Sequence, residues 1–178
     1  QAFLFIEIAF IQKFMLFLHH PLLTASVVLA SFLVFAGLGS NWSKRYSTQQ
    51  CYRQGVIWSV AGILLTGATY LLSLDTLLAA LVVWPTGARV AVSIALIAPM
   101  AFFMGMPFPL ALTSLGAGAG TLIPLAWGVN GCASVLSAVL ATLLAIHFGF
   151  SVVVLLALLL YILAAWNFRY VSTTFVSE

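Results

Sequence analysis

Glu7 is the residue of this chain whose position most suggests chemistry, because its carboxylate interrupts an apolar run. The run is "FIEIAFIQKF", residues 5–14, in which Glu7, Gln12 and Lys13 are the polar members. If the run forms a helix that ends near Leu18, Glu7 lies roughly 16 Å inside that end at 1.5 Å per residue. An ionised carboxylate near the midplane of a bilayer costs a few kcal/mol, so we expect Glu7 to be neutral or partnered.

Asn130, in the stretch "WGVNG", is the partner that the sequence suggests for Glu7. Asn130 lies about nine residues, or roughly 14 Å, into the run 121–146, counted from the opposite side of the membrane. The structural interpretation is a hydrogen bond between a neutral Glu7 and Asn130. The functional alternative is that Glu7 binds a proton or a cationic substrate. Lys13, nearer the outer end of its helix, is predicted to extend its ammonium group to the lipid headgroups.

The composition places these polar residues in a membrane protein. Of the 178 residues 64% are hydrophobic and 5% are charged, whereas a soluble domain carries roughly a quarter charged residues. The alternating pattern of a membrane β-barrel is absent. The sequence therefore predicts an all-α, polytopic membrane protein with a single transmembrane domain, residues 1–178. Six apolar runs predict spans at about 1–18, 22–39, 55–74, 90–106, 121–146 and 150–167. The run 76–84 is too short to cross a bilayer and is predicted to be interfacial or re-entrant.

Basic residues set the predicted orientation. Lys44, Arg45 and Arg53 stand without an acidic neighbour in the loop 40–54, so the positive-inside rule places this loop and both termini in the cytoplasm. The candidates for the outer face are then His19, His20, Asp75, Arg89 and His147, with Asp75 expected to offset Arg89. The net charge of +3 therefore indicates orientation in a bilayer and no nucleic-acid partner. Contact of the basic loop with anionic lipid or with a soluble partner is the alternative to a purely topogenic role.

The run 121–146 carries a packing signal. Small side chains recur in it at spacings of three and four residues, at Gly131, Ser134, Ala138, Ala141 and Ala145. Such a seam lets two helices approach closely in lipid, and Asn130, Ser134 and Ser137 beside it can form hydrogen bonds across the contact. We predict a buried central helix, and the alternative is a helix that lines a substrate path. Pro99 is expected to kink the span 90–106, either as a gate or for packing.

The sequence shows no catalytic constellation. The histidines His19, His20 and His147 are predicted to cap helices at the interface. Ligation of haem, chlorophyll or a metal is the alternative, although adjacent histidines point to different faces and no cysteine or carboxylate pair joins them. "GAGAG", residues 116–120, lacks the spacing and the preceding strand of a nucleotide-binding loop and is predicted to be a flexible connection. We therefore predict no enzyme activity and no cofactor.

Three blocks resemble one family. They are "FIEIAFIQKFMLFLHHPLLTASVVLASFLVFAGLGS", "FFMGMPFPLAL" and "IPLAWGVNGCASVLSAVLATLLAIHFGFS". In this order they look like the membrane portion of bacterial fused major-facilitator/spermidine synthase proteins, with His19 where that pattern has Gly before His-Pro. The resemblance implies a six-helix bundle like half of a major-facilitator-like fold, located in the bacterial cytoplasmic membrane. It carries over a membrane module and not an aminopropyltransferase active site.

The expected function follows from this resemblance and from the composition. We expect a non-catalytic membrane module that anchors or scaffolds a soluble spermidine synthase-like domain, with the lipid bilayer as its other partner. The first alternative is an accessory structural subunit of a larger membrane complex, in contact with other membrane subunits. The second is half of a transporter for a small, cationic solute. Because the first residue is Gln1 and the apolar run is already under way at Ala2, we expect its helix to begin upstream.

Overall fold

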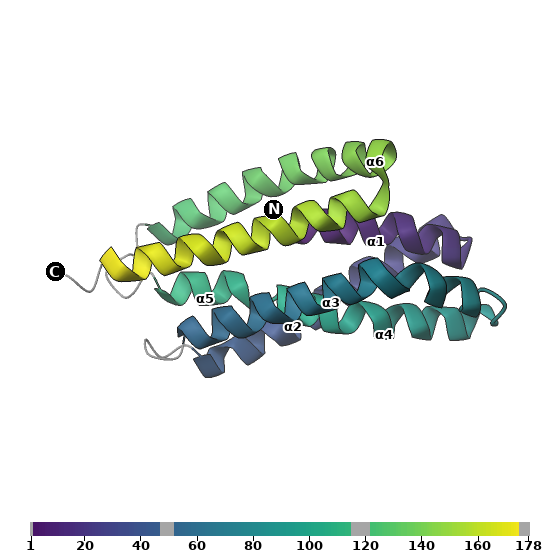
Figure 1. The fold of residues 1–178 in the computed structure, drawn as a ribbon, viewed down its shortest axis with the longest axis horizontal. Helices are drawn as coiled ribbons and strands as arrows, with labels where there is room; N and C mark the ends of the chain where they lie inside the picture. Colours follow the sequence, from purple (N-terminus) through teal and green to yellow (C-terminus); the bar gives the residue numbers. More distant parts are fainter. Residues whose placement is uncertain (1, 47–51, 115–121, 175–178) are drawn as a thin grey trace.

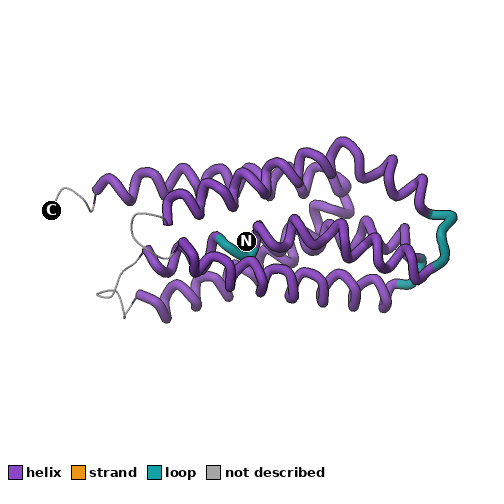
Figure 2. The backbone as a smooth tube through the Cα atoms, turned by 90° about the horizontal axis from the view of Figure 1, so that it is seen from below, coloured by secondary structure: helices purple, strands orange, loops and turns teal. Residues whose placement is uncertain are grey.

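The computed structural model describes residues 2–46, 52–114 and 122–174. Its elements are α1 (Ala2–Leu18), α2 (Pro21–Ser43), the 3₁₀ helix η1 (Lys44–Tyr46), α3 (Tyr52–Leu81), α4 (Thr86–Met104), α5 (Pro107–Ser114) and α6 (Leu122–Thr174). No strand occurs in these ranges, so the fold is all-α, as the sequence predicts. The helices lie alongside one another in an elongated bundle (Figures 1 and 2).

Four stretches of the described residues are long and apolar enough to cross a membrane. They are Pro21–Tyr46, Arg53–Leu81, Thr86–Thr113 and Ile123–Trp166. The chain is accordingly a membrane protein. The predicted count of six separate spans is not established by these stretches. Helix α1, with 17 residues, is not among these four stretches, and the predicted spans 121–146, from Leu122 on, and 150–167 both fall within α6.

Helix α6 is bent back on itself at Gly149. This residue has φ 79° and ψ 176°, a conformation that a side chain with a Cβ strongly disfavours. The chain reverses there, and residues 122–148 and 150–174 form two antiparallel arms (Figure 1). The apolar sequence on both sides of Gly149 is thus divided by backbone geometry and not by a polar loop.

Two elements differ from the sequence prediction. The segment 76–84, expected to be a separate interfacial or re-entrant piece, is not separate from the preceding span, because α3 continues without a break through Asp75 to Leu81. Asp75 forms an ion pair with Lys13 of α1, so a charge that seemed to mark the end of a span is neutralised by another helix. The expected connection after Met106 contains α5, whose first residue, Pro107, occupies a helix position where proline is well tolerated.

The two ends of the bundle have different characters. At one end, here called the turn end, α1 joins α2, α3 joins α4, and α6 reverses (Figure 1). The opposite end, which carries η1, is called the loop end. At the turn end His19 adopts φ 58°, in the left-handed region that favours glycine, and His20 is extended before Pro21 opens α2.

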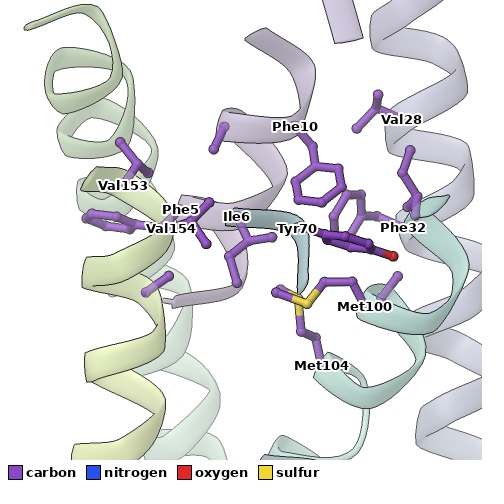
Figure 3. Close-up of a cluster of buried hydrophobic side chains, with 14 of the residues drawn as sticks. Phe5, Ile6, Phe10, Val28, Phe32, Tyr70, Met100, Met104, Val153 and Val154 are labelled. Carbon is purple, nitrogen blue, oxygen red and sulfur yellow. The ribbon is translucent and has the colours of Figure 1, made fainter. Parts of the chain in front are cut away.

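Phe10 lies at the centre of the apolar core. Its ring contacts four other aromatic rings, at centroid distances between 5.7 and 5.8 Å, those of Phe14, Phe32, Tyr70 and Phe150. These partners belong to α1, α2, α3 and α6, so one fully buried side chain joins four helices. Figure 3 shows Phe10 with Phe32, Tyr70 and the surrounding aliphatic residues.

Helices α2 and α4 approach each other at two glycines. A Cβ atom on Gly39 of α2 would lie 1.9 Å from the carbonyl oxygen of Phe102, and a Cβ on Gly105 would lie 2.1 Å from the carbonyl oxygen of Ala36. Both distances are far below van der Waals contact, so the backbones touch where the side chains are missing. In lipid, where hydrophobic burial does not drive helices together, such contacts are a principal source of association.

Pro99 lies inside α4, which remains a single helix through it. Proline has no N–H group and leaves a carbonyl one turn earlier without its helical partner. On this part of α4 the Tyr70 hydroxyl of α3 donates a hydrogen bond to the Leu96 carbonyl, and the Thr66 hydroxyl lies 3.0 Å from the Met100 sulfur. Polar side chains of α3 thus attach to α4 around the proline.

The tryptophans mark two levels along the bundle. All five are exposed, and they are Trp42, Trp58, Trp84, Trp127 and Trp166. Trp84 lies at the turn end, just after α3, whereas Trp42 and Trp127 lie roughly 33 Å away from that end at 1.5 Å per residue. The hydrocarbon core of a bilayer is about 30 Å thick, and tryptophan concentrates at its two interfaces. The bundle therefore has the dimensions to cross a membrane along its long axis.

Candidate functional site

Glu7 is buried inside the bundle, with 6% of its surface exposed. It lies on the same side of α1 as Phe3 and Phe10, whose rings pack edge-on against Phe32 of α2 at 5.6 and 5.7 Å. Figure 3 shows Phe10 and Phe32 in this contact. Among the described residues no hydrogen bond or ion pair of the Glu7 carboxyl group is found. A carboxyl group is thus buried without a polar partner among the described residues, and burial of this kind disfavours its charged form.

The predicted hydrogen bond between Glu7 and Asn130 is wrong. Asn130 is half-buried, and its backbone carbonyl accepts a hydrogen bond of 2.7 Å from the Ser134 hydroxyl. Counted from the turn end, Glu7 lies roughly 16 Å deep and Asn130 roughly 28 Å deep, at 1.5 Å per residue. The sequence estimate counted Asn130 from the other side of a 30 Å core, but the first arm of α6 is roughly 40 Å long.

Two serines lie at the level of Glu7. Ser31 of α2 and Ser137 of α6 are, like Glu7, about eleven residues from the turn end, and 5% and 3% of their surfaces are exposed. The Ser31 hydroxyl donates to the Val27 carbonyl of its own helix at 2.6 Å. Ser137 is a residue that the sequence singled out, whereas Ser31 was missed. Counting residues from His20 would have placed Ser31 at the same depth.

The small-residue seam of α6 differs in register from the predicted one. The buried small residues of the first arm recur every four positions, at Ala133, Ser137, Ala141 and Ala145. Ala141 and Ala145 belong to the predicted seam, but Ser134 and Ala138 are only half-buried. Gly131 is exposed, and a Cβ on it would meet no atom within 4 Å, so its place in the seam was wrong. A row of residues spaced four positions apart runs at an angle to the helix axis. It can therefore contact a neighbouring helix that crosses at a tilt.

Lys13 of α1 and Asp75 of α3 form an ion pair near the turn end. The Lys13 ammonium group also lies 5.3 Å from the centre of the Phe150 ring of α6, within range of a cation–π contact. The exposed fractions of the two side chains are 21% for Lys13 and 72% for Asp75. The Asp75 carboxylate, expected to offset the charge of Arg89 at this end, pairs directly with Lys13. Three helices meet at this pair.

Arg89 of α4 binds the end of α1. Its NH1 group donates a hydrogen bond of 2.8 Å to the Phe17 carbonyl, in the last turn of α1, where the helix dipole is negative. The guanidinium group lies 6.0 Å from the Phe17 ring, and within the described part of the chain its buried Nε has no partner. Together with the Lys13–Asp75 pair, this contact forms what we call the turn-end latch.

The histidines do not form a ligand set in the structure. His19 and His20 are exposed at the turn between α1 and α2, and the His20 side chain makes no capping hydrogen bond to α2. The His147 Nδ1 donates to the Leu143 carbonyl of its own helix at 2.8 Å. No group of three His, Cys, Asp or Glu side chains within the described ranges could hold a metal ion. Residues 116–120, the "GAGAG" stretch, lie outside those ranges.

The first prediction concerns the turn-end latch. Replacement Asp75→Asn leaves the Lys13 ammonium group, on a side chain that is 21% exposed, without its carboxylate. We expect a loss of about 1 kcal/mol in stability, seen as a lower Tm in mild detergent. The double replacement Lys13→Met with Asp75→Leu should recover most of this loss, because an apolar pair of similar size carries no desolvation penalty. Equal Tm values for the wild type and Asp75→Asn would show that the pair contributes nothing.

No protein-family model, curated protein or solved structure matches this chain.

Proposed function

We propose that the chain is a non-catalytic integral membrane module with an anchoring or scaffolding role. The observation that carries this proposal is the turn-end latch, in which the charged side chains at that end link α1 to α3 and α1 to α4. The glycine contacts of α2 with α4 also hold two helices together. Side chains that often serve catalysis are thus used to hold helices together.

The resemblance described from the sequence gives this module its proposed setting. It is a six-span bundle like half of a major-facilitator-like protein, with α1 to α4 and the two arms of α6 as the spans. Its membrane is the bacterial cytoplasmic membrane, and its loop end, with Lys44, Arg45 and Arg53, faces the cytoplasm. Its partners are a soluble spermidine synthase-like domain or other membrane subunits.

Purification of the intact protein in mild detergent, followed by mass spectrometry of everything that co-migrates, tests this proposal. Co-migration with a spermidine synthase-like domain is the expected result. Recovery in a stable assembly of several membrane subunits would instead favour the first alternative, an accessory structural subunit. Turnover of a substrate by the purified chain alone would contradict the non-catalytic role.

Half of a transporter for a small, cationic solute is the second candidate. It is favoured by Glu7, a buried carboxyl group without a hydrogen-bond partner among the described residues. Buried ionisable groups inside membranes commonly mark ion or proton paths.

Replacement Glu7→Gln separates the two candidates. The amide has the shape of the neutral carboxyl group but cannot bind or release a proton. For a scaffold we expect co-purification, Tm and cell-based solute uptake to equal those of the wild type. Asn41 is a polar residue on the surface, and its replacement Asn41→Ala serves as the control. Loss of uptake with preserved assembly would contradict a purely structural role and establish the transporter.

A further inference from the structure

Glu7 lies where α1 faces α2. Phe3 and Phe10 stand four residues before and three residues after Glu7, and this spacing puts all three on one side of the helix. Both phenylalanine rings contact the ring of Phe32 in α2, at centroid distances of 5.6 and 5.7 Å. Phe32 therefore reaches α1 at the level of Glu7. We call this contact between the two helices the α1–α2 seam.

The α1–α2 seam lies between two more extensive helix contacts. Helix α2 packs most extensively against α4, with backbone contacts at Gly39 and Gly105, and α1 packs most extensively against α6. The packing of α1 on α2 is less extensive than either of these contacts. The aromatic rings of Phe3, Phe10 and Phe32 meet across the seam. A change in the charge of Glu7 would therefore act on a contact that is smaller than its neighbours.

Within the described ranges no cation lies at the level of Glu7. Lys13, on the same helix, is six residues and roughly 9 Å nearer the turn end, and it pairs with Asp75. Arg89 of α4 binds the Phe17 carbonyl at that end. Helix α2 carries no charged side chain. The charged form of Glu7 is therefore not held in place by an opposite charge from the helices around it.

The titratable groups that remain at this level are two tyrosines. Tyr70 of α3 donates a hydrogen bond to the Leu96 carbonyl, and Tyr161 of α6 is 8% exposed. Each lies about eleven residues from the turn end, as Glu7 does. His147 of α6 lies at the turn end itself. Phenol groups are uncharged at neutral pH, so neither tyrosine can neutralise a carboxylate.

The closed seam therefore suits the neutral form of Glu7. The side chain is 6% exposed and has no hydrogen bond or ion pair among the described residues, and such burial disfavours a carboxylate. A carboxylate needs water or a cation beside it, and the seam can admit either only by loosening. We propose that Glu7 reversibly binds a proton and that release of the proton loosens the α1–α2 seam. This names the proton as the ligand of the site that favours the transporter candidate, and only its use in transport rests on that candidate.

The first test detects the bound proton by infrared spectroscopy of the intact protein in lipid. The chain has three acidic side chains, Glu7, Asp75 and Glu178, so the band of a protonated carboxyl group has few possible sources. We expect this band at neutral pH, where carboxyl groups exposed to water are ionised, and its reversible loss at higher pH. The band should shift when glutamate carries a heavy carbon isotope in its carboxyl group. It should be absent from Glu7→Gln and retained in the control Asp75→Asn.

The second test measures the seam by hydrogen exchange of the backbone amides of α1. Wild type and Glu7→Gln are compared at the same pH, so that the effect of pH on the exchange chemistry is equal in both. Below the pH at which the band is lost we expect equal rates. Above that pH we expect α1 of the wild type to exchange about tenfold faster, because its carboxylate favours the loosened seam. The amides of α4, which lies outside the seam, are the internal control.

The outcomes separate this proposal from the transporter candidate. Absence of the band at neutral pH, or its persistence at every pH up to unfolding, would overturn the proton site. Equal exchange of α1 in the two proteins above the transition would overturn its link to the seam. A reversible band with solute uptake unchanged in Glu7→Gln would contradict the transporter and leave the proton site standing. Loss of uptake in Glu7→Gln without a titrating band would do the reverse.

Discussion

Replacement Gly39→Ala is expected to destabilise the bundle by about 2 kcal/mol, which is the middle of the range measured when extra methyl groups are forced into tight packing. The new Cβ would lie 1.9 Å from the Phe102 carbonyl oxygen. Because this atom belongs to the backbone of α4, no side-chain rotation can relieve the overlap, and the two helices must move apart. The separation also weakens the second contact, between Gly105 and Ala36. A lower Tm in mild detergent and a lower yield of monodisperse protein would register the change.

Gly37→Ala is the matched control for this prediction. Gly37 lies on the same helix two residues away, and a Cβ on it would meet nothing within 4 Å. Alanine favours a helix over glycine by about 1 kcal/mol, so this variant should be as stable as the wild type or more stable. The same chemical change is therefore expected to act in opposite directions at two neighbouring positions. A Tm for Gly39→Ala at or above that of Gly37→Ala would contradict the close contact of α2 with α4.

The sequence predicted the helical class because its signals are local. Apolar length and low charge suffice to place helices, and a break near residues 147–149 was expected between two apolar runs. The structure places the reversal at Gly149, where only the backbone conformation marks the turn. The continuity of α3 into the segment 76–84 was not predicted for a corresponding reason. Asp75 looks like the end of a span until Lys13, 62 positions earlier in the chain, is seen to pair with it.

Contacts between helices were predicted less well. They depend on how each helix is rotated about its axis and on how deep each residue lies in the bundle, which composition does not give. Glu7 and Asn130 seemed to share a level only while the first arm of α6 was taken to be as long as the bilayer core is thick. Gly131 fitted a pattern of small residues. The residues that are buried on this arm, however, recur every four positions and include Ala133 and Ser137. Sequence spacing gives several candidate faces on a helix of small residues, and only the tilt of the neighbouring helix selects one.

Phe10→Ala is expected to have the largest effect of any single replacement, about 3 kcal/mol. That figure is the lower end of the range for truncating a buried phenylalanine in a soluble core. The lower end applies because an unfolded membrane helix keeps its side chains in lipid, which removes much of the transfer term and leaves the lost packing. The packing lost at this position is unusually broad, since the Phe10 ring joins α1 to rings on α2, α3 and α6.

Phe148→Ala provides the control, because Phe148 is 64% exposed and its truncation removes little protein packing. Thermal unfolding in one detergent, with both variants measured beside the wild type, should show a large decrease in Tm for Phe10→Ala and almost none for Phe148→Ala. A further variant, Phe10→Leu, should recover part of the loss by refilling the cavity without restoring the edge-to-face contacts. If Phe10→Ala unfolded at the wild-type temperature, the four helices would have to be held together mainly by the latch at one end and the glycine contacts near the other. The Asp75→Asn and Gly39→Ala replacements would then have to show larger effects than those expected here.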